Sequence, residues 1–510
     1  MNSTESSSGR RLRRIAAVPV ALATLALTQS ATTAATAAAD PTTNDVASVL
    51  DGLTPHRLVV AEGIERTTYS SPSSPLVVRV AVIDPDLGAV TLDSTVGAAV
   101  SVKETTTAML ATVGTTATDA PYVGVNGGYS VSHKGQDAER RAISEDRSLP
   151  MVASVQEDVV QGASCARGQN AVVLQHGRPH FTKVTTTLEI TSDRKTADVT
   201  DDVKRSVDGV NRYPGWIPFC PQGACDRPLP YKKDAAGEPV LDEDGHKVYL
   251  DENGLEISGG PYYEDDSEIV VFTSAYGQKT PEPGHTSWVK ADNVQGVEVA
   301  VDQRGYVTEK RSRRGGMEIP PNGMVLQGIG TTQSDAGAKW LDDHTQVGAK
   351  LTYTQRVTDI GFPRETATGL VNDTADDEDL VLDPAYPSLD VINGTHLLMR
   401  NAKVAAAPGD NDNTDPRTAI GTDGWGRTLL VTVTSTTDGV RHGVPIYDLA
   451  KIMEDLGSVD ALNLDGGGST TFVVDGQVKN AISNGGGVER PVYDSVYAGR
   501  GGHALPAPAN

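Results

Sequence analysis

One stretch near the C-terminus constrains the fold more than any other part of the sequence. Thr428 to Thr434 is rich in β-branched residues and reads as a strand. Apolar residues then recur at helical spacing from Leu449 to Leu456, Gly457 fits the helix stop, and Ala461 to Leu464 follows as a second strand. This order predicts a right-handed crossover between two parallel strands that are neighbours in one sheet.

The second strand ends in a glycine-rich turn, Asp465-Gly466-Gly467-Gly468-Ser469. Because side chains alternate along a strand, we expect Leu462 and Leu464 to face the core, and Asn463 and Asp465 to point the other way. The glycines remove side chains, so the N–H groups of the turn can approach a ligand. The pattern favours a carboxylate beside anion-binding amides. The alternative is a plain turn in which Asp465 caps its own backbone.

Three shorter segments repeat this combination of polar and turn-forming residues. Asn126-Gly127-Gly128 ends a short strand, and on its own it is typical of a hairpin turn. Arg417-Thr418 precedes a hydrophobic pair, and Glu489-Arg490 precedes a proline. Each arginine is either a surface charge or a clamp for phosphate or carboxylate.

Together these segments resemble the phosphodiester glycosidase family. The resemblance is carried, in chain order, by Val125–Tyr129, Asp208–Arg212, Pro416–Gly421, Ala461–Thr470 and Glu489–Pro491. It covers roughly residues 76 to 500 and leaves an acidic insertion at about 213–266 unmatched. Ser130 stands where the family usually has an aromatic residue, and the family's glycine-rich stretch before the Arg-Thr motif appears as Ile392–His396.

The resemblance implies a hydrolase that cleaves an alpha-linked sugar from a sugar-1-phosphodiester at the anomeric carbon–oxygen bond. Such chemistry passes through an oxocarbenium-like transition state and normally uses two carboxyls. We expect Asp465 to be the nucleophile or general base. Glu489 is the first candidate for the second carboxyl because it lies within a motif, and Asp494 and Glu139 are the others.

The expected substrate-binding residues form four groups. Arg417 and Arg490 would contact the phosphodiester, and Thr418 and Ser469 would add hydroxyls. Asparagine side chains would bond sugar hydroxyls, and glycine amides would line the pocket. The asparagines are Asn126, Asn211 and Asn463, and the glycines are Gly127, Gly128, Gly466, Gly467 and Gly468.

Three other functions stay open at this point. A polysaccharide glycosidase or lyase would use the arginines for a uronate carboxylate instead of phosphate. A non-catalytic envelope glycan-binding protein would keep the pocket without the chemistry. A phosphodiesterase would break the phosphorus–oxygen bond.

The N-terminus has the pattern of a signal peptide. Four arginines, at positions 10, 11, 13 and 14, precede a short apolar run, Ile15 to Leu27. Ala37-Ala38-Ala39 then supplies a cleavage site, so residues 1–39 are expected to be removed and the protein secreted. Residues 40–75 read as a mature leader. Residues 76–505 read as one α+β, strand-rich domain with a mixed sheet and few helices. No later segment reaches the length of a membrane span.

Net charge and cysteine content limit the binding partners and the covalent links that the chain can have. With 44 basic and 67 acidic side chains the net charge is −23, which argues against nucleic acid as a partner. The resemblance implies a carbohydrate or sugar-phosphate substrate, for which a negatively charged chain would need local arginines. Cys220 and Cys225 enclose four residues and are expected to form a disulfide, which leaves Cys165 over. No cofactor or metal site is expected, although the carboxylate-rich loops leave calcium open.

Overall fold

The computed structural model describes most of the chain between residues 49 and 500. The described residues are 49–87, 90–113, 121–132, 148–150, 154–156, 159–162, 169–175, 177–194, 203–214, 216–218, 227–228, 232–234, 237–240, 248–250, 256–257, 262–264, 267–283, 295–330, 336–359, 361–366, 369–372, 378–379 and 390–500. All of them belong to the compact unit formed by residues 48–510. The expected signal peptide, all three cysteines and Glu139 lie outside the described residues.

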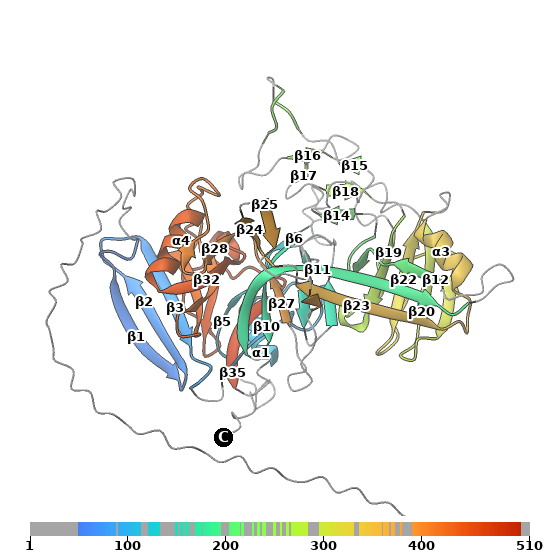
Figure 1. The fold of residues 1–510 in the computed structure, drawn as a ribbon, viewed down its shortest axis with the longest axis horizontal. Coiled ribbons are helices and arrows are strands. Elements are labelled where there is room, and N and C mark those ends of the chain that lie inside the picture. The colour runs from blue at the N-terminus through green and yellow to red at the C-terminus, as the bar shows by residue number, and fades with distance from the viewer. Residues whose placement is uncertain are drawn as a thin grey trace, which may run out of the picture. The chain divides into compact units, whose positions relative to one another are not determined.

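The Asp465 turn follows a strand of an eight-stranded antiparallel sheet (Figure 1). Its strands, in spatial order, are β1 (Thr54–Ala61), β2 (Ile64–Ser70), β3 (Leu76–Ile83), β31 (Thr428–Ser435), β30 (Arg417–Asp423), β32 (Ser458–Asn463), β28 (Leu397–Arg400) and β29 (Lys403–Val404). β1 and β2 fall within residues 40–75, so the sheet extends into the range read as a leader from the sequence.

The predicted crossover needs one correction. Strand β31, helix α4 (Ile446–Asp455) and strand β32 follow one another as expected, and Gly457 ends the helix in the left-handed conformation. However, β31 and β32 each pair antiparallel with β30, so they are parallel to each other but are not neighbours. The prediction of adjacent strands is wrong because the tight turn after Asp423 places β30 beside β31 first.

A second, five-stranded sheet contains the strand that ends at the Asn126-Gly127-Gly128 motif. It contains β34 (Gln477–Val478), β33 (Phe472–Val474), β5 (Pro121–Asn126), β35 (Ser495–Arg500) and β4 (Val90–Thr95), and α1 (Thr106–Val113) lies against β5 and β35. β33 and β34 form a hairpin around Asp475 and Gly476, which both have positive φ, as a tight hairpin turn requires. β5 ends at Asn126 and β32 ends at Asn463.

Both faces of the large sheet are buried at its centre, around β30, β31 and the end of β32. Leu462 and Leu464 lie in a core shared with the five-stranded sheet, as expected from the alternation of side chains. Ala461 faces the other way, into a core that the apolar side of α4 completes (Figure 1). Because the last three residues of β32 are buried, the polar residues at its end are held in fixed surroundings.

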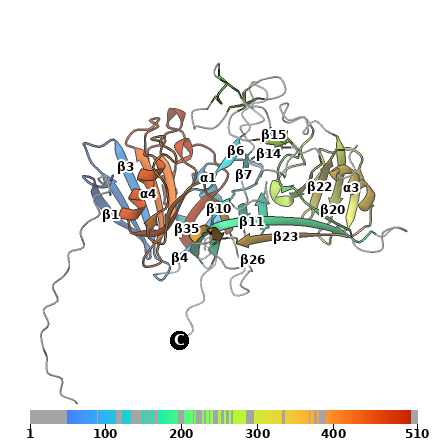
Figure 2. The ribbon, with the colours of Figure 1, turned by 45° about the horizontal axis from the view of Figure 1, so that its top comes forward.

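Two further sheets share a separate core. The first contains β26 (Glu378–Asp379), β23 (Leu351–Asp359), β11 (Arg178–Ser192), β10 (Gln169–Gln175), β27 (Asp390–Asn393), β8 (Ser154–Gln156) and β9 (Val159–Gly162), with β12 (Val203–Ser206) beside β11. The second contains β13 (Gly209–Val210), β19 (Ile269–Thr273), β22 (Met324–Ile329), β20 (Gly296–Val301) and β21 (Val307–Arg311). β11 and β23 are the long paired strands in Figure 2. Short strands also occur in the 213–266 insertion, at Trp216–Pro218, Arg227–Pro228, Tyr249–Leu250, Glu256–Ile257 and Tyr262–Glu264, and elsewhere at Ser130–Ser132, Ser148–Pro150, Pro363–Thr366 and Gly369–Asn372.

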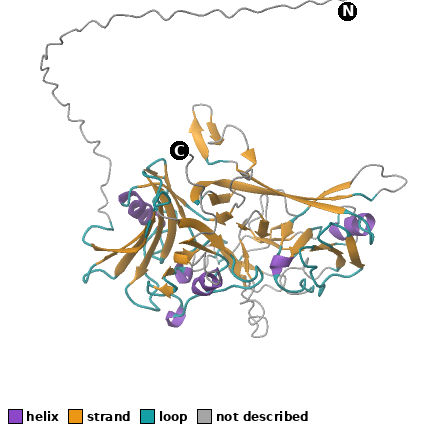
Figure 3. Ribbon diagram, turned by 90° about the horizontal axis from the view of Figure 1, so that it is seen from below, coloured by secondary structure: helices purple, strands orange, loops and turns teal. Residues whose placement is uncertain are grey.

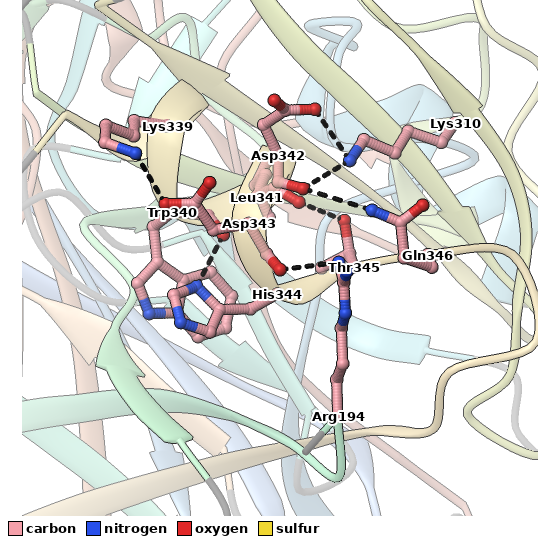
Figure 4. Close-up of polar contacts among 10 residues, drawn as sticks. All are labelled: Arg194, Lys310, Lys339, Trp340, Leu341, Asp342, Asp343, His344, Thr345 and Gln346. Atoms are coloured by element: carbon pink, nitrogen blue, oxygen red, sulfur yellow. Dashed lines mark hydrogen bonds and ion pairs between the residues drawn. The ribbon is translucent and has the colours of Figure 1, made fainter. Parts of the chain in front are cut away.

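Helix α3 (Gly337–His344) is tied to this region at its C-terminal end (Figure 4). Lys310 of β21 donates to the carbonyl oxygen of Asp342, and Arg194, just after β11, donates to that of Asp343, each at 2.6 Å. Positive groups at a helix C-terminus are favourable because they meet the unpaired carbonyls. These contacts connect the C-terminal end of the helix to β21 and to the segment that follows β11.

The predicted fold class is confirmed. Strands dominate the described residues, and the helices α1, α3 and α4 are short (Figure 3). The parallel pairing of β13 with β19 makes one sheet mixed. No helix among the described residues is long and apolar enough to cross a membrane.

Candidate functional site

Asp465 lies at the centre of the candidate site, immediately after β32. Its carboxylate accepts hydrogen bonds from the N–H of Gly466 at 2.8 Å and from the side chain of Ser469. Burial raises the pKa of Asp465 above the ordinary value for aspartate, and the hydrogen bond from Ser469 and the charge of Arg490 oppose that rise. The site therefore holds a carboxylate whose ionised form is costly and is sustained by a few specific partners.

Asn126 holds the turn in place. Its Nδ2 donates to the backbone carbonyl of Asp465 at 2.6 Å, and its Oδ1 accepts from the Thr418 hydroxyl at 2.7 Å and from the N–H of Thr471 at 3.1 Å. The N–H of Asp465 in turn donates to the carbonyl of Gly127 at 3.0 Å. Asn126 and Thr418 are fully buried, so the structure shows them connecting β5, β30 and the turn. Their contact with substrate stays a prediction.

The glycines beside Asn126 make room for Asp494. The N–H of Gly127 donates to the backbone carbonyl of Asp494 at 2.9 Å, and the N–H of Gly128 donates to its Oδ1 at 2.7 Å. A β-carbon at Gly127 would lie only 2.9 Å from Cγ of Asp494. Asp494 is thus a buried acceptor behind the Asn126-Gly127-Gly128 motif.

Amides of the Asp465 turn also have acceptors within the protein. The N–H of Gly466 is used by Asp465, and that of Gly467 donates to the carbonyl of Pro416 at 2.7 Å. Gly467 begins a 3-10 turn, η3 (Gly467–Ser469), and has φ of 59°, a conformation that suits glycine. The predicted role of these amides in binding a ligand remains untested.

One polar wall of the site contains residues that the sequence prediction left out. Nδ2 of Asn463 lies 3.2 Å from the Tyr129 hydroxyl and 3.0 Å from the Thr395 hydroxyl, and Thr395 contacts Nδ1 of His396 at 2.8 Å. Burial, together with the negative charge of Asp465, raises the pKa of Tyr129 to about 12. Burial also lowers the pKa of His396. Asn463 therefore takes part in a network of neutral hydrogen-bonding groups beside the carboxylate.

Oδ1 of Asn463 has no partner among the described residues, although Asn463 is fully buried. A buried amide oxygen without a donor is costly, which favours a site where a ligand hydroxyl supplies one. This supports the prediction that Asn463 binds sugar.

Two cations accompany Asp465. Arg490 packs on the turn so closely that a β-carbon at Gly468 would lie 2.5 Å from its Cζ. Its charge and that of Lys103 both act to lower the pKa of Asp465. The structure therefore brings Arg490 to the predicted carboxylate and adds Lys103, which no sequence motif indicated.

Arg417 is buried at the back of the turn. Its Nε donates to the carbonyl of Val444 at 2.8 Å, and its Nη2 donates to the carbonyl of Asn413 at 2.7 Å. Its charge opposes the rise that burial causes in the pKa of Tyr129, and it adds to the lowering that burial causes in the pKa of His396. Arg417 thus stabilises the loops behind the site, and its predicted contact with a phosphodiester rests on no described contact.

Two predicted residues are engaged elsewhere. The carboxylate of Glu489 accepts two hydrogen bonds from Thr107, from the N–H at 2.9 Å and from the hydroxyl at 2.8 Å, at the start of α1. Asn211 follows β13 in the separate mixed sheet, where its Oδ1 accepts from the N–H of Thr273 at 2.9 Å. Its φ of 52° is one that asparagine tolerates better than most residues.

Within the described part of the chain, no group of three or more His, Cys, Asp or Glu side chains is arranged to hold a metal ion. The predicted residues that do lie at the Asp465 turn are gathered from four separate segments of the chain. They are Asn126, Gly127, Thr418, Asn463, Gly466, Gly467, Gly468, Ser469 and Arg490.

A buried carboxylate on a strand-end turn, accompanied by cations and by neutral hydrogen-bonding groups, is the combination expected of a carbohydrate hydrolase. Comparison with known proteins agrees with this class. Residues 295–498 match the family model for phosphodiester glycosidases, so the resemblance to that family is confirmed over the part of the chain that holds the motifs from Pro416 to Pro491.

Among curated proteins, a similar one is the N-acetylglucosamine-1-phosphodiester alpha-N-acetylglucosaminidase of Mus musculus. It is 30% identical over 123 residues, which are 21% of this chain and 23% of that protein. The corresponding Bos taurus protein matches to the same extent. The chain thus spans less than a quarter of the length of these curated relatives.

Solved structures show the fold. A Burkholderia pseudomallei protein described as exported superimposes with a TM-score of 0.58 at 20% identity, covering 83% of this chain and 74% of that one. A Synechocystis protein gives a TM-score of 0.52 at 15% identity, covering 88% of this chain and 64% of that one.

Proposed function

We propose that the protein is a secreted hydrolase that releases an alpha-linked sugar from a sugar-1-phosphodiester or a related cell-envelope glycan. The observation that carries this proposal is the position of the Asp465 carboxylate. It is fixed by Gly466 and Ser469, lies beside the cation Arg490, and adjoins the wall formed by Tyr129 and Asn463. The match to phosphodiester glycosidases supports the same reaction class.

The chemistry follows from this arrangement. Asp465, ionised, attacks the anomeric carbon or activates a water molecule to do so. The bond between the anomeric carbon and the phosphate oxygen breaks, and its electron pair stays on that oxygen, which becomes part of a phosphomonoester. Arg490 faces the growing negative charge, and the oxygen of water ends on the sugar. A phosphate leaves readily, which relaxes the need for a second carboxyl as acid.

Substrate turnover tests the proposal. We expect a glycosyl-1-phosphodiester to be hydrolysed in oxygen-18 water with the label entering the sugar. Label in the phosphate would instead assign phosphorus–oxygen cleavage. Turnover only of a neutral aryl alpha-glycoside, or of a uronate-containing polysaccharide, would replace phosphate as the recognised group.

A matched pair of variants assigns the carboxylate. Asp465→Asn should abolish hydrolysis with the fold intact, since asparagine keeps the shape but supplies no nucleophile. Asp475→Asn changes an exposed aspartate in the β33–β34 turn and should have no effect. Near-normal turnover by Asp465→Asn would contradict the assignment.

Secretion is part of the proposal and is supported by the pattern of residues 1–39. The Burkholderia pseudomallei protein of similar fold is also described as exported. Sequencing the N-terminus of the protein recovered from outside the cell should give Asp40 as its first residue. An intact N-terminus on intracellular protein would contradict it.

A further inference from the structure

Two segments far apart in the sequence are joined beside the Asp465 turn. The N–H of Glu104 donates to the carbonyl of Val492 at 3.2 Å, and the N–H of Val492 donates to that of Glu104 at 2.7 Å. This isolated antiparallel bridge fixes the segment before α1 against the segment that follows Arg490. Lys103 directly precedes Glu104 in the chain, and Arg490 lies two residues before Val492.

A second contact reinforces the first. Glu489 accepts both the N–H and the hydroxyl of Thr107 in the first turn of α1, where backbone N–H groups have no partner within the helix. A carboxylate there also meets the positive end of the helix dipole. Two pairs of hydrogen bonds, only a few residues apart, therefore set the distance between the Lys103 and Arg490 backbones.

The other end of the Lys103 segment is also fixed. The N–H of Val100 donates to the carbonyl of Ala275 at 2.9 Å, and the hydroxyl of Ser101 donates to that of Tyr276 at 2.5 Å. Lys103 is thus presented from a segment tied down on both sides, while Arg490 rests directly on Gly468.

We propose that Lys103 and Arg490 form a two-cation clamp for the phosphate group of the substrate, and that Glu489 is a positioning residue that holds the clamp together. The clamp deepens the proposed function and rests on it. Lys103 is a binding residue that the sequence motifs do not contain. Glu489 acts through Arg490 and α1 instead of serving as the second carboxyl expected from the sequence.

The charges at the site agree with this role. Arg490 and Lys103 each act to lower the pKa of Asp465, so both positive charges are felt at the carboxylate where the anomeric bond would break. A phosphodiester carries one negative charge, and the departing phosphomonoester gains a second as the anomeric bond breaks. A clamp of two fixed cations therefore favours the transition state over the bound diester.

Phosphate binding tests Lys103 without depending on turnover. Titration of the full chain with inorganic phosphate should show binding that Lys103→Met weakens roughly tenfold or more, as expected for the loss of a charge-assisted contact. Lys403→Met, which removes an exposed lysine from β29, should leave the affinity unchanged. An unchanged affinity in Lys103→Met, or no phosphate binding by the natural protein, would overturn the clamp.

Kinetics with two substrates of the same sugar test Glu489. Glu489→Ala removes both contacts to Thr107 and should raise KM for the phosphodiester several-fold, with the neutral aryl glycoside unaffected. Glu489→Gln keeps an acceptor for the Thr107 N–H and should recover most of the loss. If Glu489→Gln abolishes turnover of both substrates while its thermal unfolding is unchanged, Glu489 is a catalytic carboxyl and the positioning role is wrong. If the natural protein hydrolyses neither substrate, the proposed function fails, and the phosphate titrations of Lys103→Met and Glu489→Ala still decide the clamp.

Discussion

Replacing Gly468 by alanine would displace Arg490 while leaving the backbone of the turn unstrained. The new β-carbon would lie 2.5 Å from Cζ of Arg490 and 2.9 Å from its Nε. Since carbon atoms in contact prefer separations of about 3.5 to 4.0 Å, the guanidinium must move by about 1 Å. Gly468 does not have the positive φ of its neighbour Gly467, so alanine fits its conformation.

A displacement of about 1 Å in a group that positions substrate can lower the rate about 100-fold, equivalent to about 2.7 kcal/mol of transition-state stabilisation. Stability should hold or rise slightly, because alanine in place of glycine at a compatible position gains about 0.4–1 kcal/mol. We therefore expect Gly468→Ala to have a normal melting temperature and a kcat/KM for a glycosyl phosphodiester about 100-fold below normal.

The assay needs a control and a double-mutant cycle. Gly485→Ala introduces a methyl group in the loop preceding Arg490 where nothing lies within 4 Å, and should be silent. In an Arg490→Met background, Gly468→Ala should have little further effect, because its only consequence is to move Arg490. Full activity in a folded Gly468→Ala variant, or additive losses in the cycle, would refute this account of the turn.

Three further outcomes follow from the same structure. Asp465→Asn should raise the melting temperature at pH 7 as well as abolish turnover. The raised pKa of Asp465 means that its ionised form destabilises the fold above that pKa. The difference in melting temperature from the natural protein should vanish as the pH falls below about 3.9, where aspartate becomes neutral even in the unfolded chain. Ser469→Ala should shift the acid limb of the kcat/KM profile to higher pH, since it removes a hydrogen bond that lowers the pKa of Asp465; a shift to lower pH would contradict the contact. Glu268→Ala should cost about 3–5 kcal/mol in urea unfolding, because it leaves Arg212 buried without its ion-pair partner, and should leave kcat/KM of the folded protein unchanged.

Local patterns predicted the elements well where one physical rule decides them. β31 begins at Thr428, where its β-branched run begins, and α4 follows its apolar repeat towards Gly457. The order of strands in the sheet is set by contacts between distant segments instead. Nothing local to β31 and β32 indicates that β30 lies between them.

The candidate site divides in the same way. Asp465, Asn463 and Arg490 could be predicted because each lies in a short motif with an unusual composition. Tyr129 belongs to a motif, since it directly follows Asn126-Gly127-Gly128. Only the fold, however, shows that its hydroxyl lies beside Asn463. No motif surrounds Lys103 in the sequence. Lys103 is brought to the site by the bridge between Glu104 and Val492, two residues that lie 388 positions apart in the chain.

The structure gives the glycines of the site a different role from the one that the sequence predicts. From the sequence, their use was to expose N–H groups to a ligand. In the structure, the amides of Gly127, Gly128 and Gly467 already donate to the protein, and the missing side chains make room for Asp494 behind Gly127 and for Arg490 over Gly468. A turn built in this way fixes Asp465 before substrate arrives and leaves recognition of the anion to charged side chains. Anion affinity should therefore fall steeply with ionic strength and with removal of either cation, because salt screens partly exposed side-chain charges.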